Sequence, residues 1–238
     1  MNAAHGGEET RRNFRRELAA DLVEFDVNAR QLPSGFEFDA VVVTGSRSSV
    51  YDDEPWIDDL TDWLAAAHAR DLPILGVCYG HQALAAALGG RVEYMGEFEI
   101  GYRQVSHSGD ELFSGIDEAF TVFTTHQDRV AELPPGATEI ATNDYGVHGF
   151  RKGNAWGVQF HPEYDTAMAE HVTRAKEEYL GADGVEAVLD GITPEAYDAA
   201  CEAKRLFDNF LEYARRRREA DGPVGGEFVG DEASPASD

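Results

Sequence analysis

Apolar side chains in the first ninety residues recur with two different spacings. From about Glu8 to Leu22, and again from Pro55 to Arg70, they stand three or four residues apart, which is the spacing of one helix face. Residues 38–44 and 74–77 instead contain unbroken apolar runs, which are typical of strands buried on both faces of a parallel sheet. Because helices alternate with such strands, the pattern predicts an α/β fold with a doubly wound, mostly parallel sheet flanked by helices.

A different pattern begins at Arg91, where short stretches of alternating apolar and polar residues predict a smaller, antiparallel, strand-rich part. The predicted strands cover residues 92–94, 101–105, 120–123, 139–141, 147–150 and 156–160. One further short strand is predicted earlier in the chain, at residues 23–27, where apolar and polar side chains also alternate.

Residues 166–220 have helical periodicity and predict a C-terminal helical extension. Its last helix is expected to begin with Thr193 as the cap and Pro194 at the first position, and to run to about Arg218. Residues 221–238 are rich in glycine, serine and acidic side chains, a composition that favours disorder. The chain is thus expected to contain one domain, residues 1–220, followed by a disordered acidic tail.

The N-terminus is unusual for this pattern, since a doubly wound sheet of this kind normally opens with a central strand before the first helix. Here only a few residues precede Glu8. Two explanations are open: residues 1–5 supply a short piece of that strand, or the true start of the protein lies upstream.

The strand at 74–77 leads directly into the helix-forming residues 83–88, and between them stands the sequence Gly76-Val77-Cys78-Tyr79-Gly80. A strand that turns sharply into a helix leaves the residue at the bend in a strained conformation, and flanking glycines relieve the crowding. The side chain at the bend then projects above the sheet edge, where the helix N-terminus favours a thiolate. An isolated cysteine is more often an inert core residue, but this setting predicts that Cys78 is a nucleophile.

A second motif, Gln159-Phe160-His161-Pro162-Glu163, ends the last predicted strand. Residues two apart in an extended segment share a face, so His161 and Glu163 are expected to point the same way. A carboxylate in that position orients an imidazole and stabilises its charged form. We therefore expect Cys78, His161 and Glu163 to form a catalytic triad, in preference to a chance pair of surface side chains.

The charge of the chain narrows the class of protein further. The 238 residues include 45 acidic and 20 basic side chains, a formal net charge of −25, which disfavours nucleic acid as a partner. The acidic residues are spread along the chain, and only Lys152, Lys176 and Lys204 are lysines. We interpret this surface as an adaptation to a salt-rich, halophilic cytosol, in which concentrated salt screens the repulsion.

Other classes are disfavoured by what the sequence lacks. Cys78 and Cys201 stand alone, without the spacing of a disulfide framework or a zinc site. No apolar stretch approaches the length of a membrane span or has the pattern of a signal peptide. We therefore expect a cytoplasmic protein with no membrane association, no metal and no cofactor.

Together, segments 76–82 and 157–163 resemble the two signature motifs of class I, triad-type glutamine amidotransferases. The resemblance covers roughly residues 8 to 165 and is closest to the amidotransferase domain of GMP synthase and its stand-alone relatives. It implies an enzyme whose cysteine attacks the side-chain amide of glutamine, so that ammonia leaves and a γ-glutamyl thioester is hydrolysed to glutamate. His161 would act first as base and then as acid to the leaving ammonia.

The resemblance also implies roles for further residues. Backbone N–H groups at Gly45 and Tyr79 would form the oxyanion hole. Substrate binding would involve Gln82 on the elbow helix and Thr125 and His126, which lie in a segment, Thr125-His126-Gln127-Asp128, that is similar to a Ser-His-Gly-Asp stretch of the family. Glu99-Ile100-Gly101 resembles a Glu-x-Gly that supports the elbow loop.

Two positions depart from the family's pattern. The oxyanion loop of the family commonly reads Gly-Gly-Pro, whereas this chain has Gly45-Ser46-Arg47, and a positive φ at the second position would strain Ser46. Gln127 stands where the substrate-contacting segment usually has a glycine.

Three functions are compatible with these observations. The leading hypothesis is a glutaminase that supplies ammonia to a separate synthetase, with GMP synthase as the nearest analogy, because the sequence shows no glycine-rich ATP-binding loop. A second hypothesis keeps the triad but assigns it to hydrolysis of γ-glutamyl peptides or conjugates. A third is a non-catalytic regulatory subunit on the same scaffold, which the departure at Ser46 leaves open.

Overall fold

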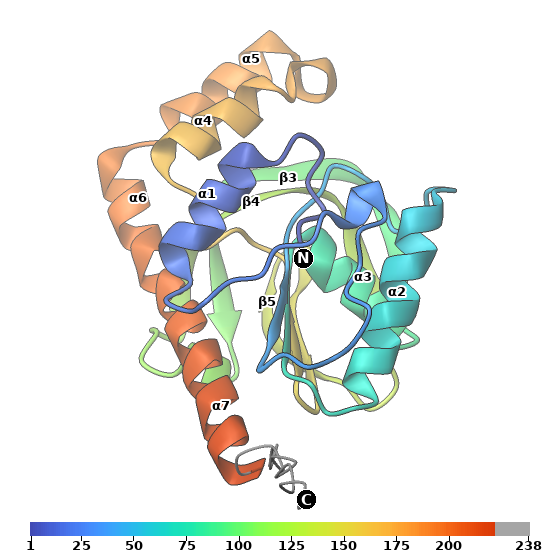
Figure 1. The fold of residues 1–238 in the computed structure, drawn as a ribbon. Coiled ribbons are helices and arrows are strands. Elements are labelled where there is room, and N and C mark those ends of the chain that lie inside the picture. The colour runs from blue at the N-terminus through green and yellow to red at the C-terminus, as the bar shows by residue number, and fades with distance from the viewer. Residues whose placement is uncertain (222–238) are drawn as a thin grey trace, which may run out of the picture.

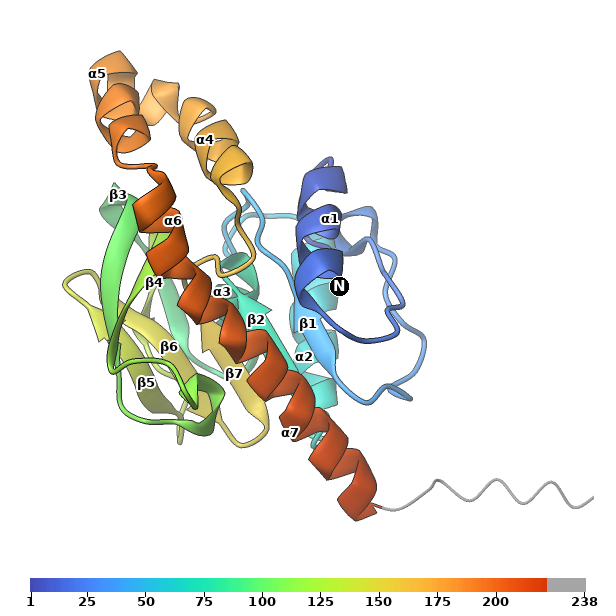
Figure 2. The ribbon, with the colours of Figure 1, turned by 90° about the vertical axis from the view of Figure 1, so that its left-hand side faces the viewer.

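The computed structural model describes residues 1–221, so the predicted acidic tail lies outside the described residues except for its first position. One seven-stranded mixed sheet, in the order β1-β2-β7-β6-β5-β3-β4, forms the centre of the described chain (Figures 1 and 2). The strands are β1 (Val41–Val43), β2 (Ile74–Val77), β3 (Arg91–His107), β4 (Ala119–Glu132), β5 (Thr138–Asn143), β6 (Gly146–Lys152) and β7 (Ala155–Val158).

Helices flank this sheet. They are α1 (Glu8–Glu17), α2 (Pro55–His68), α3 (Tyr79–Ala87), α4 (Thr166–Arg174), α5 (Glu177–Asp190), α6 (Pro194–Ala200) and α7 (Arg205–Asp221), with short 3-10 turns η1 (Val27–Ala29), η2 (Glu111–Phe113) and η3 (Cys201–Lys204). The predicted α/β class with a C-terminal helical extension is confirmed.

The parallel part of the sheet consists of β1, β2 and β7, and the remaining pairs are antiparallel. The strand-rich part predicted after Arg91 therefore continues the same sheet. Its predicted strands at 92–94 and 101–105 are joined in the 17-residue β3, which pairs with β4 along its length through a register shift between Tyr94 and Glu99. Pairing between β3 and β4 thus extends both strands beyond the stretches in which apolar and polar residues clearly alternate.

The two faces of the sheet carry separate hydrophobic clusters. Helices α1 and α7 cover one face, where Phe14 and Phe207 pack with Trp156 and Phe160. Helices α2 and α3 cover the other face, where the predicted apolar stripe of α2 is buried. That stripe consists of Trp56, Leu60, Trp63 and Leu64. Neighbouring residues of β2 alternate between the clusters, with Ile74 in one and Val77 in the other, as expected for a strand covered on both sides.

The first helix is shorter than predicted, because α1 ends at Glu17 rather than near Leu22. Leu18, in extended conformation, caps the helix and packs into the core, whereas Leu22 is 42% exposed. The strand predicted at 23–27 was also wrong, since only an isolated bridge joins Asp26 to Asn2 there. Of the three apolar residues on which the longer helix was predicted, Phe14 and Leu18 are buried and Leu22 is not. The buried apolar face therefore ends at Leu18, and the helix ends with it.

Residues 1–3 lie alongside β1, which is an edge strand of the sheet. The Met1 ammonium donates to the carbonyl oxygen of Val42 at 2.7 Å, and the Thr44 N–H donates to the carbonyl oxygen of Met1 at 3.1 Å. Burial of the ammonium lowers its pKa to about 6, against the attraction of Glu24 and Asp26.

The C-terminal extension is divided where one long helix was predicted after Pro194. Thr193 caps α6 as expected, accepting a hydrogen bond from the Ala196 N–H at 3.2 Å, but η3 separates α6 from α7. Helix α7 crosses one face of the sheet diagonally (Figure 2), while α4 and α5 pack against β3 at the end of the molecule that is uppermost in Figure 1.

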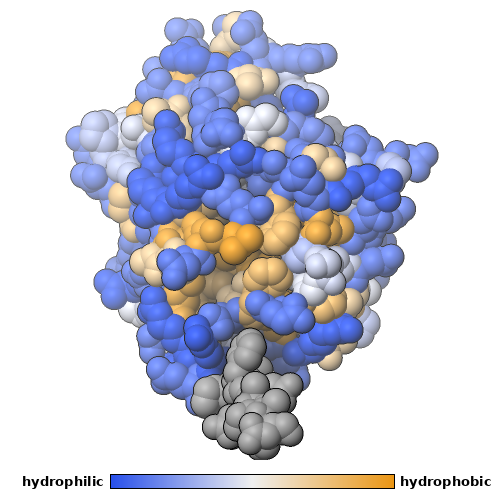
Figure 3. Space-filling view, viewed as in Figure 1, coloured by the Kyte–Doolittle hydropathy of each residue, from blue (hydrophilic) through white to orange (hydrophobic). Residues whose placement is uncertain are grey.

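A hollow lies beside β1 and is visible as an apolar depression in Figure 3. It has a volume of about 1450 Å³ and is lined by residues of α1, of segment 18–25, of β1 and of α7. Cys78, His161 and Glu163 do not line it, so this hollow and the predicted chemistry are separate. Within residues 1–221, no helix is both long enough and apolar enough to cross a membrane.

Candidate active site

The chain bends sharply at Cys78, between the end of β2 and the start of α3. Cys78 has φ 53° and ψ −104°, in the left-handed half of backbone space that residues with a side chain rarely adopt. A Cβ added at Gly80 would lie 2.3 Å from the carbonyl oxygen of Val43, and one added at Gly76 would lie 2.3 Å from that of Gly80. Both flanking glycines are therefore required by close backbone contacts, and the bend has the geometry of a nucleophile elbow.

His161 and Glu163 lie side by side next to this bend. The Nδ1 atom of His161 is 2.8 Å from Oε1 of Glu163, and the imidazole and the Cys78 side chain both lie against the backbone of Gly45. Tyr164 stacks on the imidazole with ring centroids 4.1 Å apart, and the His161 N–H donates to the carbonyl oxygen of Phe123. Tyr164 thus contacts the face of the His161 ring, Glu163 binds its Nδ1 edge, and Phe123 holds the His161 backbone.

The surroundings of His161 shift the pKa of its imidazole in two directions. Burial by itself lowers the pKa of His161, but the charges of Glu163 and Cys78 and the hydrogen bond with Glu163 raise it to about 10.

The predicted oxyanion positions lie on either side of this pair. A Cβ added at Gly45 would be 2.9 Å from Cε1 of His161 and 3.7 Å from Cβ of Cys78, so the Gly45 backbone lies directly against them. Tyr79 is the first residue of α3, where backbone N–H groups have no partner within the helix. Ser46 does not have a positive φ, so the strain considered for it is absent.

The three predicted substrate-binding residues are placed differently from one another. The carbonyl oxygen of Thr125 is 4.0 Å from the Cys78 sulfur, and the Thr125 hydroxyl is buried with no partner. Gln82 is 3% exposed, and its amide nitrogen donates to the carbonyl oxygen of Asp128 and to Oε1 of Gln159, each at 3.0 Å. Only the Gln82 side-chain oxygen remains for another partner. The His126 ring nitrogens are bonded to the Glu99 carboxylate and to the carbonyl oxygen of Asp128.

Glu99, His126 and His148 form a buried cluster whose ligand atoms lie within 4.8 Å of one another. The Glu99 Oε2 atom is 2.7 Å from Nε2 of His126 and 3.0 Å from Nε2 of His148, while Asn143 donates to Oε1. These are hydrogen-bond distances, and the hydrogen bonds alone explain why the carboxylate is buried. Burial raises the pKa of Glu99, but the two histidines lower it further, to about 2.

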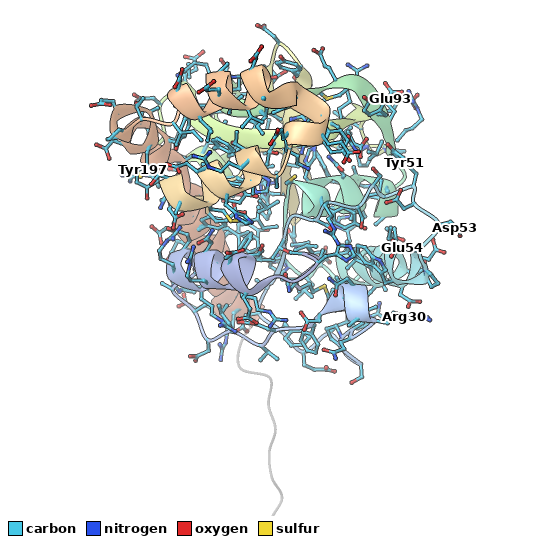
Figure 4. All side chains as sticks on the ribbon, turned by 90° about the horizontal axis from the view of Figure 1, so that it is seen from above. Arg30, Tyr51, Asp53, Glu54, Glu93 and Tyr197 are labelled. Atoms are coloured by element: carbon cyan, nitrogen blue, oxygen red, sulfur yellow. The ribbon has the colours of Figure 1, made fainter. Side chains whose placement is uncertain are left out.

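Asp128, which the sequence analysis treated only as part of a segment, joins several parts of the site. Its carboxylate accepts hydrogen bonds from the Ser49 hydroxyl at 2.5 Å and from the Tyr51 hydroxyl at 2.6 Å. Its carbonyl oxygen accepts from Gln82 and from Nδ1 of His126. The loop after β1, which starts at Gly45 and carries Tyr51 on its outer side (Figure 4), is thereby attached to β4 and to the elbow helix.

Neither Asp128 nor Tyr164 was singled out from the sequence. Tyr164 follows the His161-Pro162-Glu163 motif directly, and an aromatic residue adjoining a buried histidine was the available signal. No comparable signal exists for the contacts of Asp128, because Ser49 and Tyr51 are 79 and 77 residues away in the chain.

The fold and this constellation define a class: an α/β protein in which a cysteine at a nucleophile elbow contacts a buried histidine–glutamate pair. A family model described as glutamine amidotransferase class-I matches residues 9–177, and the chain belongs to that family. The predicted family and enzyme class are confirmed.

Curated relatives include two GMP synthases described as glutamine-hydrolysing. The one from Pyrobaculum aerophilum is 42% identical over 129 residues, which are 53% of this chain and 24% of the relative. The one from Staphylococcus aureus is 36% identical over 126 residues, which are 52% of this chain and 24% of the relative. The matched part of the chain thus spans about a quarter of the length of these relatives.

Solved structures show the same fold over most of the chain. A glutamine amidotransferase from Thermotoga maritima superposes with a TM-score of 0.74 at 24% identity, covering 90% of this chain and 95% of that one. One from Methylobacillus flagellatus has a TM-score of 0.76 at 20% identity, covering 89% and 92%. Because these superpositions cover about nine tenths of the chain, they extend into the C-terminal helical extension.

Proposed function

We propose that this chain hydrolyses the side-chain amide of L-glutamine and passes the ammonia to a separate synthetase. The observation that carries the proposal is the placement of Cys78, at the elbow, and of the buried His161–Glu163 pair against the same Gly45 backbone. An amide requires a strong nucleophile, an acid for the leaving nitrogen and a site for the oxyanion, and these residues supply all three.

In the first half of the reaction, the Cys78 thiolate attacks the amide carbon, a C–S bond forms and the carbonyl electron pair moves onto oxygen. Backbone N–H groups at Tyr79 and in the loop at Gly45 stabilise that oxyanion. The imidazolium of His161 then gives its proton to the amide nitrogen, the C–N bond breaks, and ammonia leaves a γ-glutamyl thioester.

In the second half, water attacks the thioester carbonyl while neutral His161 takes a proton from the water. The C–S bond breaks, glutamate leaves, and the thiolate–imidazolium pair is restored. Glu163 contributes by holding Nδ1 of His161 and stabilising the charged ring in both halves.

The proposed acceptor is a synthetase chain that aminates a nucleotide, as GMP synthase does. Support comes from the two relatives, of which the matched segment is only 24%. The rest of such an enzyme would have to be supplied by another chain or another segment. Likeness of fold alone does not determine the acceptor.

The test measures ammonia and glutamate release from L-glutamine in concentrated KCl, using the wild type, Cys78→Ala and, as a matched control, Cys201→Ala. We expect Cys78→Ala to lose at least about a thousandfold in kcat/KM, while Cys201→Ala retains wild-type turnover. Turnover that survives in Cys78→Ala would contradict the proposal.

The same assay separates the two other hypotheses. Release of glutamate from γ-glutamyl peptides, but not from glutamine, would indicate the conjugate hydrolase. Absence of turnover with every substrate, with and without a cell lysate to supply a partner, would indicate the regulatory subunit.

A further inference from the structure

The apolar hollow beside β1 takes no part in the proposed chemistry, because none of the three triad residues lines it. Its volume of about 1450 Å³ exceeds the roughly 300–1,000 Å³ of a small-ligand pocket. One wall is formed by β1 and the residues before it, and the opposite wall by segment 18–25 (Figure 3). A hollow of this size along an edge strand has the form of a groove for a segment of polypeptide.

The first residues of the chain enter this groove as a short strand that is paired on both sides. On the β1 side, the Met1 ammonium donates to the carbonyl oxygen of Val42 at 2.7 Å. On the other side, the Asn2 N–H donates to the carbonyl oxygen of Phe25 at 2.8 Å, and the Val27 N–H donates to that of Asn2 at 3.1 Å. The sheet therefore continues past β1 for two residues, and Met1 and Asn2 both line the hollow.

The backbone of β1 has further hydrogen-bonding groups on the groove side. Val41 donates its N–H to the carbonyl oxygen of Pro73, toward β2, at 2.9 Å. Because alternate residues of a parallel strand bond to opposite neighbours, the N–H of Val42 and the C=O of Ala40 are directed to the groove. An extended chain that continued upstream from Met1 would bond to both of these groups through its second residue before Met1.

The opposite wall carries apolar side chains whose burial declines with distance from Asn2. Val27 is fully buried, Phe25 is partly buried, and Val23 is 68% exposed. The alternation of these residues predicted a strand at 23–27, but only a parallel bridge between Asn2 and Asp26 forms there. A strand placed ahead of Met1 would pair with this segment and cover Val23, and so supply the partner on which the alternating pattern depends.

The Met1 nitrogen has the surroundings of a peptide group within a strand. It is buried, and burial of a charged ammonium is costly, which is why its pKa falls to about 6. A peptide N–H at the same place would donate the same hydrogen bond to Val42 without burying a charge.

We propose that the groove accepts one β-strand of about five residues, parallel to β1, and that this strand is the stretch of the same polypeptide directly preceding Met1. Residues 38–42 line the groove along its length, which sets the number of residues that can pair. The occupant belongs to this chain because the C-terminal end of such a strand coincides with the Met1 nitrogen, where a strand of another molecule would collide with it.

Both faces of the strand would be covered by apolar side chains. Phe14 and Leu18 belong to the hydrophobic cluster on one face of the sheet, and Phe36 and Phe38 pack against the cluster on the other. All four line the groove. The occupant is therefore expected to be an unbroken apolar run, as in other strands buried on both faces.

The groove is also connected to the candidate oxyanion loop. The Ala3 N–H donates to the hydroxyl of Thr44, directly before Gly45, at 3.0 Å, and Nε2 of His5 is 2.9 Å from the hydroxyl of Ser48. Residues 1–5 therefore join the strand position to both ends of the loop, and a strand in the groove would hold them in place.

The first test lengthens the chain at its N-terminus. Five apolar, β-branched residues are placed directly before Met1, and this variant is compared with the unextended chain and with one that carries five glycine and serine residues there. We expect the apolar extension to raise the melting temperature by on the order of 10 °C, because several apolar side chains become buried. The Gly-Ser extension should leave it close to that of the unextended chain. Equal melting temperatures of the two extended chains would overturn the proposal.

The second test determines whether the added strand lies in the groove. Val23→Asp should change the melting temperature little in the unextended chain, where Val23 is exposed, but should cancel much of the gain from the apolar extension. Tyr94→Asp, at an exposed residue that does not line the groove, should have the same effect in both chains. An equal effect of Val23→Asp in both chains would also overturn the proposal.

The third test identifies the natural occupant. Protein isolated from the cells that produce it is sequenced from its N-terminus, and we expect an apolar stretch ahead of Met1. A native chain that begins at Met1 would contradict the proposal. So would a loss of stability on removal of residues 222–238 that Val23→Asp abolishes, which would assign the groove to the C-terminal segment. A dimer that dissociates when the apolar extension is added would assign the groove to a second copy instead.

These measurements record stability, sequence and oligomeric state, and none requires glutamine turnover. Failure of the groove proposal would therefore leave the proposed function in place, and a chain that does not hydrolyse glutamine would leave the groove proposal in place.

Discussion

At the scale of single residues, the site depends on one unfavourable backbone conformation. Cys78 is one of three non-glycine residues with positive φ in the described chain, the others being Arg30 and Asp71. Such a conformation costs on the order of 1–3 kcal/mol and persists only where the surroundings enforce it. Here β2, α3 and the close contacts of Gly76 and Gly80 enforce it, and the strained residue is the candidate nucleophile.

The first prediction concerns Gly80→Ala. The new Cβ would lie 2.3 Å from the backbone oxygen of Val43, which cannot move without displacing β1. We expect the free energy of unfolding to fall by about 3 kcal/mol, the upper part of the range for overpacking, and glutaminase activity to fall with it.

The control is Gly191→Ala, because Gly191 has φ −81° and the nearest atom to its added Cβ is 3.3 Å away. Both variants are compared with the wild type by urea unfolding. Equal stability of the two variants would show that the close contact at Gly80 is not limiting.

The second prediction concerns the pH dependence of the buried Glu99. The pKa of Glu99 lies near 2 in the folded protein, against an ordinary value of 4.5, so its contribution to stability is present above pH 4.5 and is lost as the pH falls toward 2. We expect the stability difference between the wild type and Glu99→Gln to shrink over this range, by an amount on the order of 3 kcal/mol.

The measurement is urea unfolding of both proteins at several pH values, with Glu97→Gln, at an exposed position two residues earlier, as the control. Because many other carboxylates titrate in the same range, only the difference between proteins is informative. A difference that stays constant with pH would show that the two histidines do not stabilise the Glu99 carboxylate.

At the scale of elements, the arrangement of the site depends on connections between segments far apart in the chain. The loop after β1 carries the candidate oxyanion donor, and its Ser49 and Tyr51 hydroxyls donate to both oxygens of Asp128 on β4. The carbonyl of the same residue holds Gln82 on α3. Asp128 thus connects the loop after β1 to the elbow helix α3 through hydrogen bonds.

The third prediction follows from this connection. Tyr51→Phe removes one hydrogen bond to Asp128, and because Tyr51 is 54% exposed we expect little loss of stability. We expect kcat/KM for glutamine to fall by on the order of tenfold, as for one hydrogen bond to a charged group. Asp128→Ala should reduce it further.

A double-mutant cycle provides the check. If Tyr51 acts through Asp128, Tyr51→Phe should have almost no effect in the Asp128→Ala background. Tyr94→Phe, at a similarly exposed tyrosine on β3, is the control. Additive effects in the cycle would show that Tyr51 does not act through Asp128.

At the scale of the whole molecule, the dominant electrostatic feature is the net charge of −25. Many arginines form exposed ion pairs, such as Arg30 with Asp59 and Arg218 with Asp39. Each exposed pair contributes at most about 1 kcal/mol and is itself screened by salt. Acidic residues exceed basic ones by 25, so repulsion among unpaired carboxylates outweighs these pairs.

The fourth prediction is that salt stabilises the fold. The Debye length falls from about 10 Å at 0.1 M to about 3 Å at 1 M salt, which screens repulsion between surface carboxylates. We expect the melting temperature to rise by on the order of 10 °C between about 0.1 M and 2 M KCl. The check is a series of thermal unfolding curves, and a melting temperature that falls with KCl would reject the halophilic interpretation.

The local pattern was sufficient wherever one element forms from its own residues. Helix α2 and strand β2 have nearly the predicted bounds, and Thr193 caps α6 as predicted, because periodicity, capping and backbone preference act over a few residues. The bend at Cys78 and the common face of His161 and Glu163 belong to the same group, since both depend on neighbours in the sequence.

The pattern was insufficient where burial against distant segments decides the outcome. It did not predict the end of α1 at Glu17, the joining of two short stretches into β3, or the break between α6 and α7. In each case, packing against distant segments determines where the helix or strand begins and ends. Local propensity does not contain that information.

By itself, then, the sequence determined the class of fold and the residues that local geometry places, because these depend on short-range spacing, and its two motifs carried the resemblance to the family. Only the tertiary structure decided which residues from elsewhere meet them. His161 and Cys78, which are 83 positions apart in the chain, lie against the same Gly45 backbone, and Asp128 joins the loop after β1 to α3. Such contacts depend on how the sheet and helices pack together, which no local pattern specifies.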